Sequence, residues 1–116
     1  MSDIQKYKDM QKRLTLMQDP AWVKVIQALK SFKYDDTKDY SVIFKEEKQR
    51  KNRNQNFHEV TYVEETDSFI FISYVLNFEC SELTEEIRNR IVLKDIDIID
   101  IRVTDKFRFE DYFFAE

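Results

Sequence analysis

Hydrophobic residues recur with a helical period over the first thirty positions. Residues 3–17 place five apolar side chains on one stripe: Ile4, Tyr7, Met10, Leu14 and Met17. Apolar spacings of three and four predict an amphipathic helix, which Ser2 can cap. Asp19 and Pro20 predict the start of a second helix, because a first-turn proline lacks an N–H that would have no partner there. This second helix should run to about Phe32, with Trp22, Val25, Ile26 and Leu29 facing one way.

The period changes to two beyond residue 38, which is typical of strands. Residues 39–47 alternate between apolar and polar side chains. The polar stretch 48–56 predicts a loop or an exposed hairpin tip, and residues 57–64 resume the strand pattern. Residues 69–78 are almost all apolar, with many β-branched and aromatic side chains. Such a run predicts a central strand that is buried on both faces.

The next stretch is polar, and two structures are open for it. Residues 81–89 can form a short helix capped by Ser81, or a polar loop. Residues 91–93 then predict a short strand, residues 94–97 a tight turn, and residues 99–103 a last strand.

The predicted fold class is therefore α+β, with an N-terminal helical pair packed on a small, strongly bent antiparallel sheet or an SH3/Sm-like barrel. A length of 116 residues predicts one domain. Its parts are the helical pair 1–34, the sheet 39–104 and an aromatic-acidic tail 105–116.

The composition excludes several kinds of chemistry. Without glycine the chain has neither a P-loop nor a dinucleotide-binding turn, since both need a backbone that closely approaches phosphate. One Cys and one His cannot supply the thiolate and imidazole ligands of a four-coordinate zinc site, and one Cys forms no internal disulfide. We therefore expect no catalysis, no cofactor and no metal. The chain shows no transmembrane run and no signal-peptide pattern, so we expect a cytoplasmic protein.

Charge is divided unequally between the two halves of the chain. Residues 1–58 carry 13 Lys/Arg and eight Asp/Glu, a formal +5, whereas residues 59–116 carry six and 15, a formal −9. The basic half contains a candidate nucleic-acid surface, because Lys and Arg neutralise phosphate and an aromatic ring can stack on an unpaired base. Its residues are Lys45, Lys48, Arg50, Lys51, Arg53, Phe57 and His58. The alternative is a solvated hairpin tip.

The acidic half ends in a tail rich in aromatic side chains, which commonly anchor protein interfaces. Together with Asp100 it forms the candidate protein-binding set: Phe107, Phe109, Glu110, Asp111, Tyr112, Phe113 and Phe114. Such a segment can bind a partner protein or a second copy of the chain. The alternative is that the tail folds back over the sheet or the helices, because five exposed aromatic side chains would be a liability.

Three acids and two single residues invite other interpretations. Asp95, Asp97 and Asp100 resemble a magnesium or acid/base cluster, but no nucleophile or anion loop accompanies them. We interpret them as exposed charges on an edge strand that discourage aggregation. The sequence favours a surface position for His58 and a small apolar filler role for Cys80.

The order of the strands carries a resemblance to a known family. Residues 90–101 read as an apolar strand, a turn with Asp-Ile, and a second apolar strand, and residues 60–72 fit the preceding hairpin. Over roughly residues 40–103 the chain resembles the YolD-like family of Gram-positive bacteria, their phages and plasmids. The resemblance implies a non-catalytic accessory protein linked to translesion polymerases and DNA-damage tolerance. The chain departs from the family pattern where glycine usually stands in the first strand turn and residues 48–56 stand instead.

Two functions follow as expectations. The first is a protein-binding accessory or inhibitor of a mobile element or phage of a low-GC Gram-positive bacterium. Its partner is another protein, and a nucleic-acid-binding protein is one candidate. The second is a small nucleic-acid-binding module that holds RNA or single-stranded DNA through residues 45–58. A homodimer is compatible with either function.

Overall fold

A computed structural model describes residues 3–46, 51–79 and 82–106, without the side chains of residues 77–79, 82 and 83. Two helices, α1 (Asp3–Leu16) and α2 (Pro20–Lys30), open the chain as predicted. The side chain of Asp19 accepts a hydrogen bond from the Ala21 N–H at 3.0 Å, so the expected cap of α2 is present.

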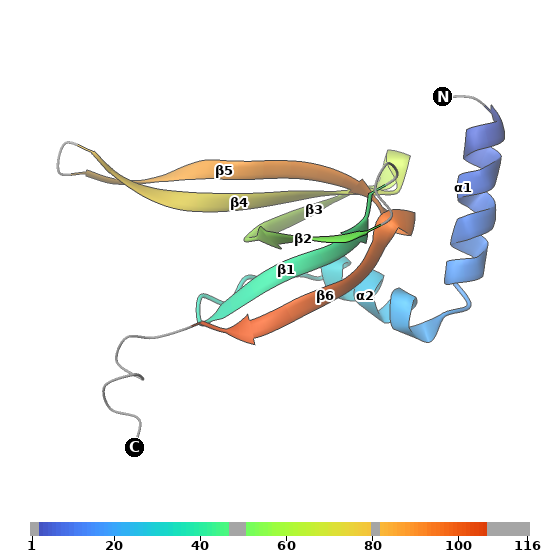
Figure 1. Ribbon diagram of the computed structural model, residues 1–116, viewed down its shortest axis with the longest axis horizontal. Helices are drawn as coiled ribbons and strands as arrows, with labels where there is room; N and C mark the ends of the chain where they lie inside the picture. The colour runs from blue at the N-terminus through green and yellow to red at the C-terminus, as the bar shows by residue number, and fades with distance from the viewer. Residues whose placement is uncertain (1–2, 47–50, 80–81, 107–116) are drawn as a thin grey trace, which may run out of the picture.

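Two antiparallel three-stranded sheets follow the helices (Figure 1). The first has the order β2-β1-β6 and the second the order β3-β4-β5. The His58 N–H donates to the Ile72 carbonyl at 2.8 Å, which joins β2 to the second sheet where the chain turns into β3. The strands are β1 (Lys38–Lys45), β2 (Asn52–Phe57), β3 (Glu59–Val63), β4 (Ser68–Glu79), β5 (Glu82–Lys94) and β6 (Ile98–Asp105), with 3₁₀ turns η1 (Glu64–Thr66) and η2 (Asp95–Asp97).

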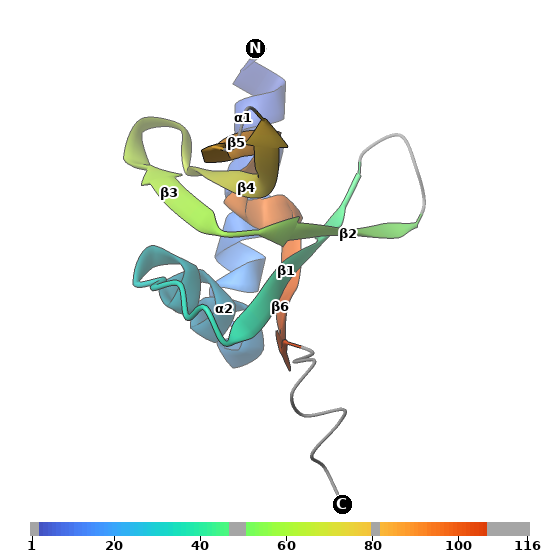
Figure 2. The same cartoon turned by 90° about the vertical axis from the view of Figure 1, so that its left-hand side faces the viewer.

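The core lies between the two sheets and α2, which packs against β3 and β6 (Figure 2). Helix α2 contributes Trp22, Ile26 and Leu29, and the sheets contribute Val42, Phe57, Phe69, Phe71 and Ile98. The predicted α+β class, with an N-terminal helical pair packed on small antiparallel β-structure, is confirmed, and the β-structure consists of two three-stranded sheets.

The helix or loop predicted for residues 81–89 is wrong for residues 82–89, which are the first part of β5, and residue 81 lies outside the described residues. Strand β5 pairs with β4 in a long hairpin in which Leu76 lies opposite Glu85 and Tyr74 opposite Ile87. The cap-like sequence favoured a local helix. The twelve residues of β4 offer a continuous ladder of backbone hydrogen bonds instead, and such tertiary pairing overrides local propensity.

The prediction that residues 69–78 are buried on both faces is also wrong. Phe69 and Phe71 lie in the core, but the side chain of Leu76 is 64% exposed. The pairing of β3 with β4 ends where Glu59 lies opposite Ile72, so the far half of the β4–β5 hairpin extends beyond the body of the molecule (Figure 1).

The polar stretch 48–56 is described from residue 51 onward, and residues 48–50 lie outside the described residues. Residues 52–56 belong to β2 and pair with β1, with Phe44 opposite Arg53. Strand β2 is an edge strand whose side chains are mostly exposed, which explains why no hydrophobic alternation marked it.

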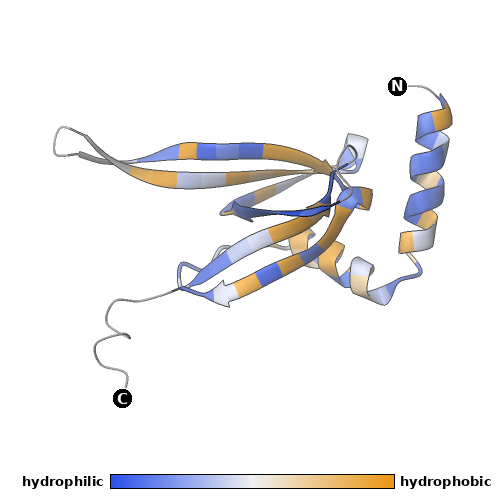
Figure 3. Ribbon diagram, viewed as in Figure 1, coloured by the Kyte–Doolittle hydropathy of each residue, from blue (hydrophilic) through white to orange (hydrophobic). Residues whose placement is uncertain are grey.

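Polar and apolar residues follow one another along α1 (Figure 3), and its charged residues contact the body while its apolar stripe is exposed. The Lys94 ammonium donates to Asp9 at 3.0 Å, and the Lys12 ammonium lies 3.7 Å from Asp97. Leu16 packs against the core. The five stripe residues Ile4, Tyr7, Met10, Leu14 and Met17 are between 51% and 68% exposed.

Asp95 joins α1, α2 and the sheet. The Arg13 guanidinium donates to both carboxylate oxygens of Asp95, from Nε at 2.9 Å and from Nη2 at 2.8 Å. The indole N–H of Trp22 donates to the Asp95 carbonyl at 3.3 Å, and the Asp95 N–H donates to the Asp67 carbonyl at 2.9 Å. The interpretation of Asp95 as an exposed edge charge is therefore wrong, since Asp95 is only 5% exposed.

Asp67 supplies the sharp turn that this junction needs. Its backbone adopts the left-handed conformation, with φ 49° and ψ 45°. In a chain without glycine, Asp is among the few residues that enter this region at low cost. The Asp67 carboxylate also accepts a hydrogen bond from the Tyr62 hydroxyl at 3.1 Å.

Replacing Arg13→Ala should destabilise the fold by at least about 2 kcal/mol, because the buried Asp95 carboxylate would lose its partner. The matched control is Lys12→Ala, which removes a long, half-exposed pair with Asp97 and should cost less than about 0.5 kcal/mol. Urea unfolding followed by the fluorescence of Trp22, the single tryptophan, measures both. Equal losses would contradict the central place of the Arg13–Asp95 pair.

Acid should weaken the attachment of α1. Burial pushes the pKa of Asp9 up, but hydrogen bonds from Lys94 and Gln5 outweigh it, so the pKa of Asp9 lies below its ordinary 3.8. A lowered folded pKa adds stability above pH 3.8 that is lost as the pH falls through the lower value. Between pH 5 and 2.5 the urea midpoint of the wild type should fall further than that of Asp9→Asn. Parallel curves would contradict this role.

Candidate functional site

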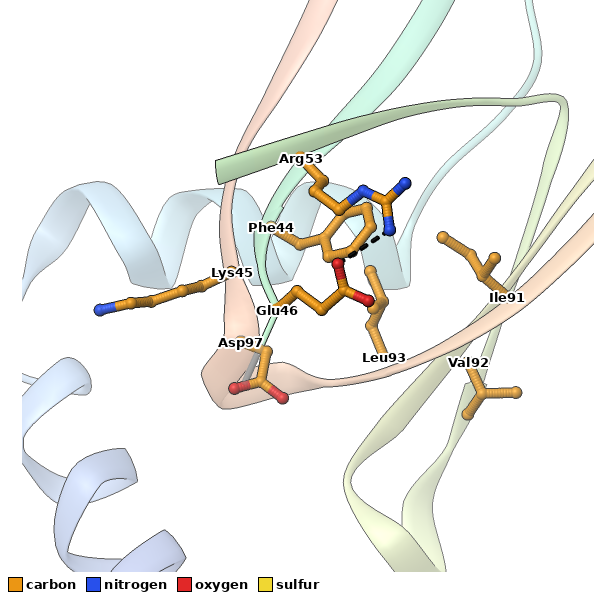
Figure 4. A pocket seen from close by; sticks show the side chains of 8 residues that line it. All are labelled: Phe44, Lys45, Glu46, Arg53, Ile91, Val92, Leu93 and Asp97. Atoms are coloured by element: carbon orange, nitrogen blue, oxygen red, sulfur yellow. Dashed lines mark hydrogen bonds and ion pairs between the residues drawn. The ribbon is translucent and has the colours of Figure 1, made fainter. Parts of the chain in front are cut away.

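A wide-open groove with a volume of about 610 Å³ lies between the two sheets. Its apolar wall comes from Phe44 on β1 and from Ile91 and Leu93 on β5 (Figure 4). The Arg53 guanidinium donates to Glu46 at 2.8 Å and spans the groove beside Phe44. The groove therefore combines an apolar wall with a polar rim, completed by Lys45 and Asp97.

Strand β5 forms one wall of this groove and is the edge of its sheet. In the part of the chain that the structure describes, no further strand pairs with the outer side of β5. An edge of thirteen residues is a template for an added strand.

The outer side of the same sheet also carries exposed apolar side chains, with Arg90 among them opposite Ile72. Val92 lies opposite Ile70, and Ile87 lies opposite Tyr74. Val92 is 56% exposed and Ile87 is 59% exposed, close to the 64% of Leu76. The outward face of an antiparallel sheet is ordinarily polar, so this apolar face is a candidate contact surface. We call Ile70, Ile72, Tyr74, Leu76, Ile87 and Val92 the outer face.

Only part of the predicted nucleic-acid surface is available for binding in the structure. Phe57 is 1% exposed and lies in the core, so its ring is not presented to an unpaired base and this assignment is corrected. Arg53 already pairs with Glu46. Lys45 and Lys51 are exposed, whereas Lys48 and Arg50 lie outside the described residues.

His58 has a structural partner. Its Nδ1 accepts a hydrogen bond from the Tyr74 N–H at 3.0 Å, across the junction of the two sheets. The imidazole ring also contacts the ring of Tyr34, with centroids 5.3 Å apart. His58 is half-buried, so the expected surface position is corrected, and the ring joins β4 to the junction of β2 and β3.

Of the predicted protein-binding set, only Asp100 lies among the described residues. Asp100 is exposed on β6, and its carboxylate accepts a hydrogen bond from the Ile101 N–H at 2.8 Å. Asp97 is half-buried and lies 3.7 Å from Lys12, so it is not a free edge charge. The tail from Phe107 to Glu116 lies outside the described residues, as does Cys80.

No motif in the sequence marked the groove or the outer face. Ile91 and Leu93 read as strand positions, and Ile87 read as part of a helix or loop. Their exposure follows from strand pairing across β4, which a single sequence does not reveal. The only available signal was the excess of apolar residues in 69–78 and 91–93 over what one small core can bury.

Among the described residues, no group of three His, Cys, Asp or Glu side chains is placed to hold a metal ion. Neither helix in the described ranges has the length and apolar character needed to cross a membrane. No family model, curated protein or solved structure matches the chain.

Proposed function

We propose that the chain is a non-catalytic protein-binding module, and that its partner supplies an extended segment that pairs with the free edge of β5. The observation that carries this proposal is the position of β5 between the groove and the outer face. Alternate side chains of an added strand point to opposite sides of the sheet. One set would enter the groove over Phe44 and Leu93, and the other would continue the outer face beside Val92.

The charge around this surface supports a basic partner. Glu59 on β3 and Glu85 on β5 lie on this side of the sheet, opposite Ile72 and Leu76 respectively, and Arg90 on β5 also lies opposite Ile72, so these three charges leave an acidic excess of one. Acidic residues around an apolar centre favour a partner whose rim carries Lys or Arg, because complementary potentials steer the encounter. A nucleic-acid-binding protein has such a surface, which agrees with the accessory role implied by the YolD-like resemblance.

The nucleic-acid-binding module is the second candidate. It keeps the exposed Lys45 and Lys51, but it loses Phe57 to the core. Without a stacking ring, phosphate contacts alone would give weak binding that falls steeply with salt. The geometry therefore favours protein binding, and the cellular role as accessory or inhibitor of a mobile element is part of this proposal.

Replacing Val92→Glu should reduce partner capture at least about tenfold, because a carboxylate would be buried at the centre of the contact. The tagged protein is incubated with nuclease-treated lysate of a low-GC Gram-positive bacterium at low and high salt, and captured protein is quantified by mass spectrometry. The wild type should retain a specific protein at both salt concentrations.

The matched control is Val103→Glu, an equivalent change at a 48% exposed valine on β6, an edge strand of the first sheet, which should leave capture unchanged. The triple change of Lys48, Arg50 and Lys51 to Gln, which leaves the groove residues Lys45 and Arg53 in place, should also leave capture unchanged. Recovery of nucleic acid alone, lost at high salt and in the triple variant, would overturn the proposal in favour of the second candidate.

A further inference from the structure

The apolar stripe of α1 is the largest exposed apolar feature that the proposed function does not use. On a helical wheel at about 100° per residue, Tyr7, Met10 and Leu14 lie roughly opposite the side that binds the body. That side carries Asp9, Lys12, Arg13 and Leu16. The ion pairs hold α1 in an orientation that presents the stripe to solvent.

The stripe has the spacing of a helix interface and a basic rim. Tyr7, Met10, Leu14 and Met17 are separated by three, four and three residues, which is the seam of a helix that packs against a partner. Lys6 and Lys8 lie on either side of it, are exposed and form no salt bridge with any described residue. Helix α1 carries four Lys/Arg and two Asp, a formal +2. A complementary occupant is apolar and acidic.

The last ten residues of this chain have that composition. They contain five aromatic side chains, one Arg and three acids, a formal −2: Phe107, Arg108, Phe109, Glu110, Asp111, Tyr112, Phe113, Phe114 and Glu116 with Ala115. Each aromatic side chain can bury roughly 150–250 Å². The segment begins directly after Lys106, which follows the end of β6.

The segment cannot cover the stripe of its own chain. Strand β6 starts beside η2, which contacts α1, and then runs away from α1 for eight residues, or roughly 26 Å (Figure 1). The stripe itself spans 13 helical steps, or roughly 20 Å. Ten extended residues reach at most about 35 Å, which is less than the return path and the stripe together.

We propose that residues 107–116 of one copy dock on the α1 stripe of a second copy. If half of the aromatic surface is buried, each contact removes roughly 1,000 Å² from water, counting both sides. Two reciprocal contacts related by a two-fold axis then bury roughly 2,000 Å², the upper end of a standard stable interface. This association uses neither the edge of β5 nor the outer face, so it is independent of the proposed function.

The test uses two full-length variants. The acceptor-dead variant carries Tyr7→Gln and Leu14→Gln, which remove exposed apolar groups and keep good helix formers. The donor-dead variant carries Phe109→Ser, Tyr112→Ser and Phe113→Ser. Wild-type protein should dimerise with a dissociation constant that rises at least about tenfold in each variant, as measured by sedimentation equilibrium. Unchanged Trp22 fluorescence and urea midpoints establish that both variants fold.

The decisive experiment mixes the two variants. The acceptor-dead chain keeps an intact tail and the donor-dead chain keeps an intact stripe, so the mixture should form, through one of the two contacts, a heterodimer that is weaker than the wild-type dimer and that neither variant forms alone. Native mass spectrometry distinguishes the species by mass. The heterodimer should weaken as salt rises, because the rim and the tail carry opposite charges.

Three outcomes would overturn the proposal. Monomeric wild-type protein would exclude self-association. A dimer that survives the donor-dead substitutions but not the acceptor-dead ones would mean that two α1 stripes pair with each other. Failure of the mixture to form a heterodimer would exclude the exchange of tails. None of these results bears on partner capture by β5, which the Val92→Glu experiment tests separately.

Discussion

The buried carboxylate of Asp95 is the group on which the arrangement of the elements depends. The two carboxylate oxygens of Asp95 accept hydrogen bonds from the Arg13 guanidinium. The backbone carbonyl of Asp95 accepts one from the Trp22 indole N–H, and its backbone N–H donates to the Asp67 carbonyl. The pKa of Arg13 is raised, mainly by its hydrogen bond to Asp95, so charge and geometry reinforce each other. A carboxylate at this depth is tolerated only while these partners remain, because an unpaired buried charge is far more costly than the net gain from the pair. The junction therefore holds α1 in one orientation.

Because of that orientation, the apolar side of α1 faces solvent and its charged side faces the body, which is the reverse of a packed surface helix. Ordinarily the apolar stripe drives the attachment. Here the attachment is ionic, through Asp9, Arg13 and Lys12, and the stripe stays outside. An exposed stripe of this length is a liability for a monomer unless another surface covers it. The charge balance of the chain, basic at the start and acidic at the end, supplies a complementary surface in the same molecule.

The second exposed surface arises from unequal strand lengths. Strands β4 and β5 have 12 and 13 residues, whereas β3 has five, so the sheet narrows to a two-stranded hairpin beyond Ile72. A two-stranded ribbon has two free edges and no third strand to cover Leu76 or Ile87. Groove, edge and outer face thus meet along β5. Apolar walls beside a free backbone edge are the features that favour the addition of a strand.

Local pattern determined much of this protein. The Asp19 cap, the first-turn Pro20 and the alternation around Val42 were sufficient for the helical pair, for β1 and for the α+β class, because these signals act over a few residues. Long-range pairing decided the rest. Residues 82–89 became a strand because β4 lay beside them, Phe57 entered the core at the bend between two sheets, and the α1 stripe stayed exposed because Arg13 found Asp95 82 positions away. Periodicity marks which side of a helix is apolar, but only the tertiary structure decides whether that side or the charged one meets the core, since a buried ion pair has no sequence period.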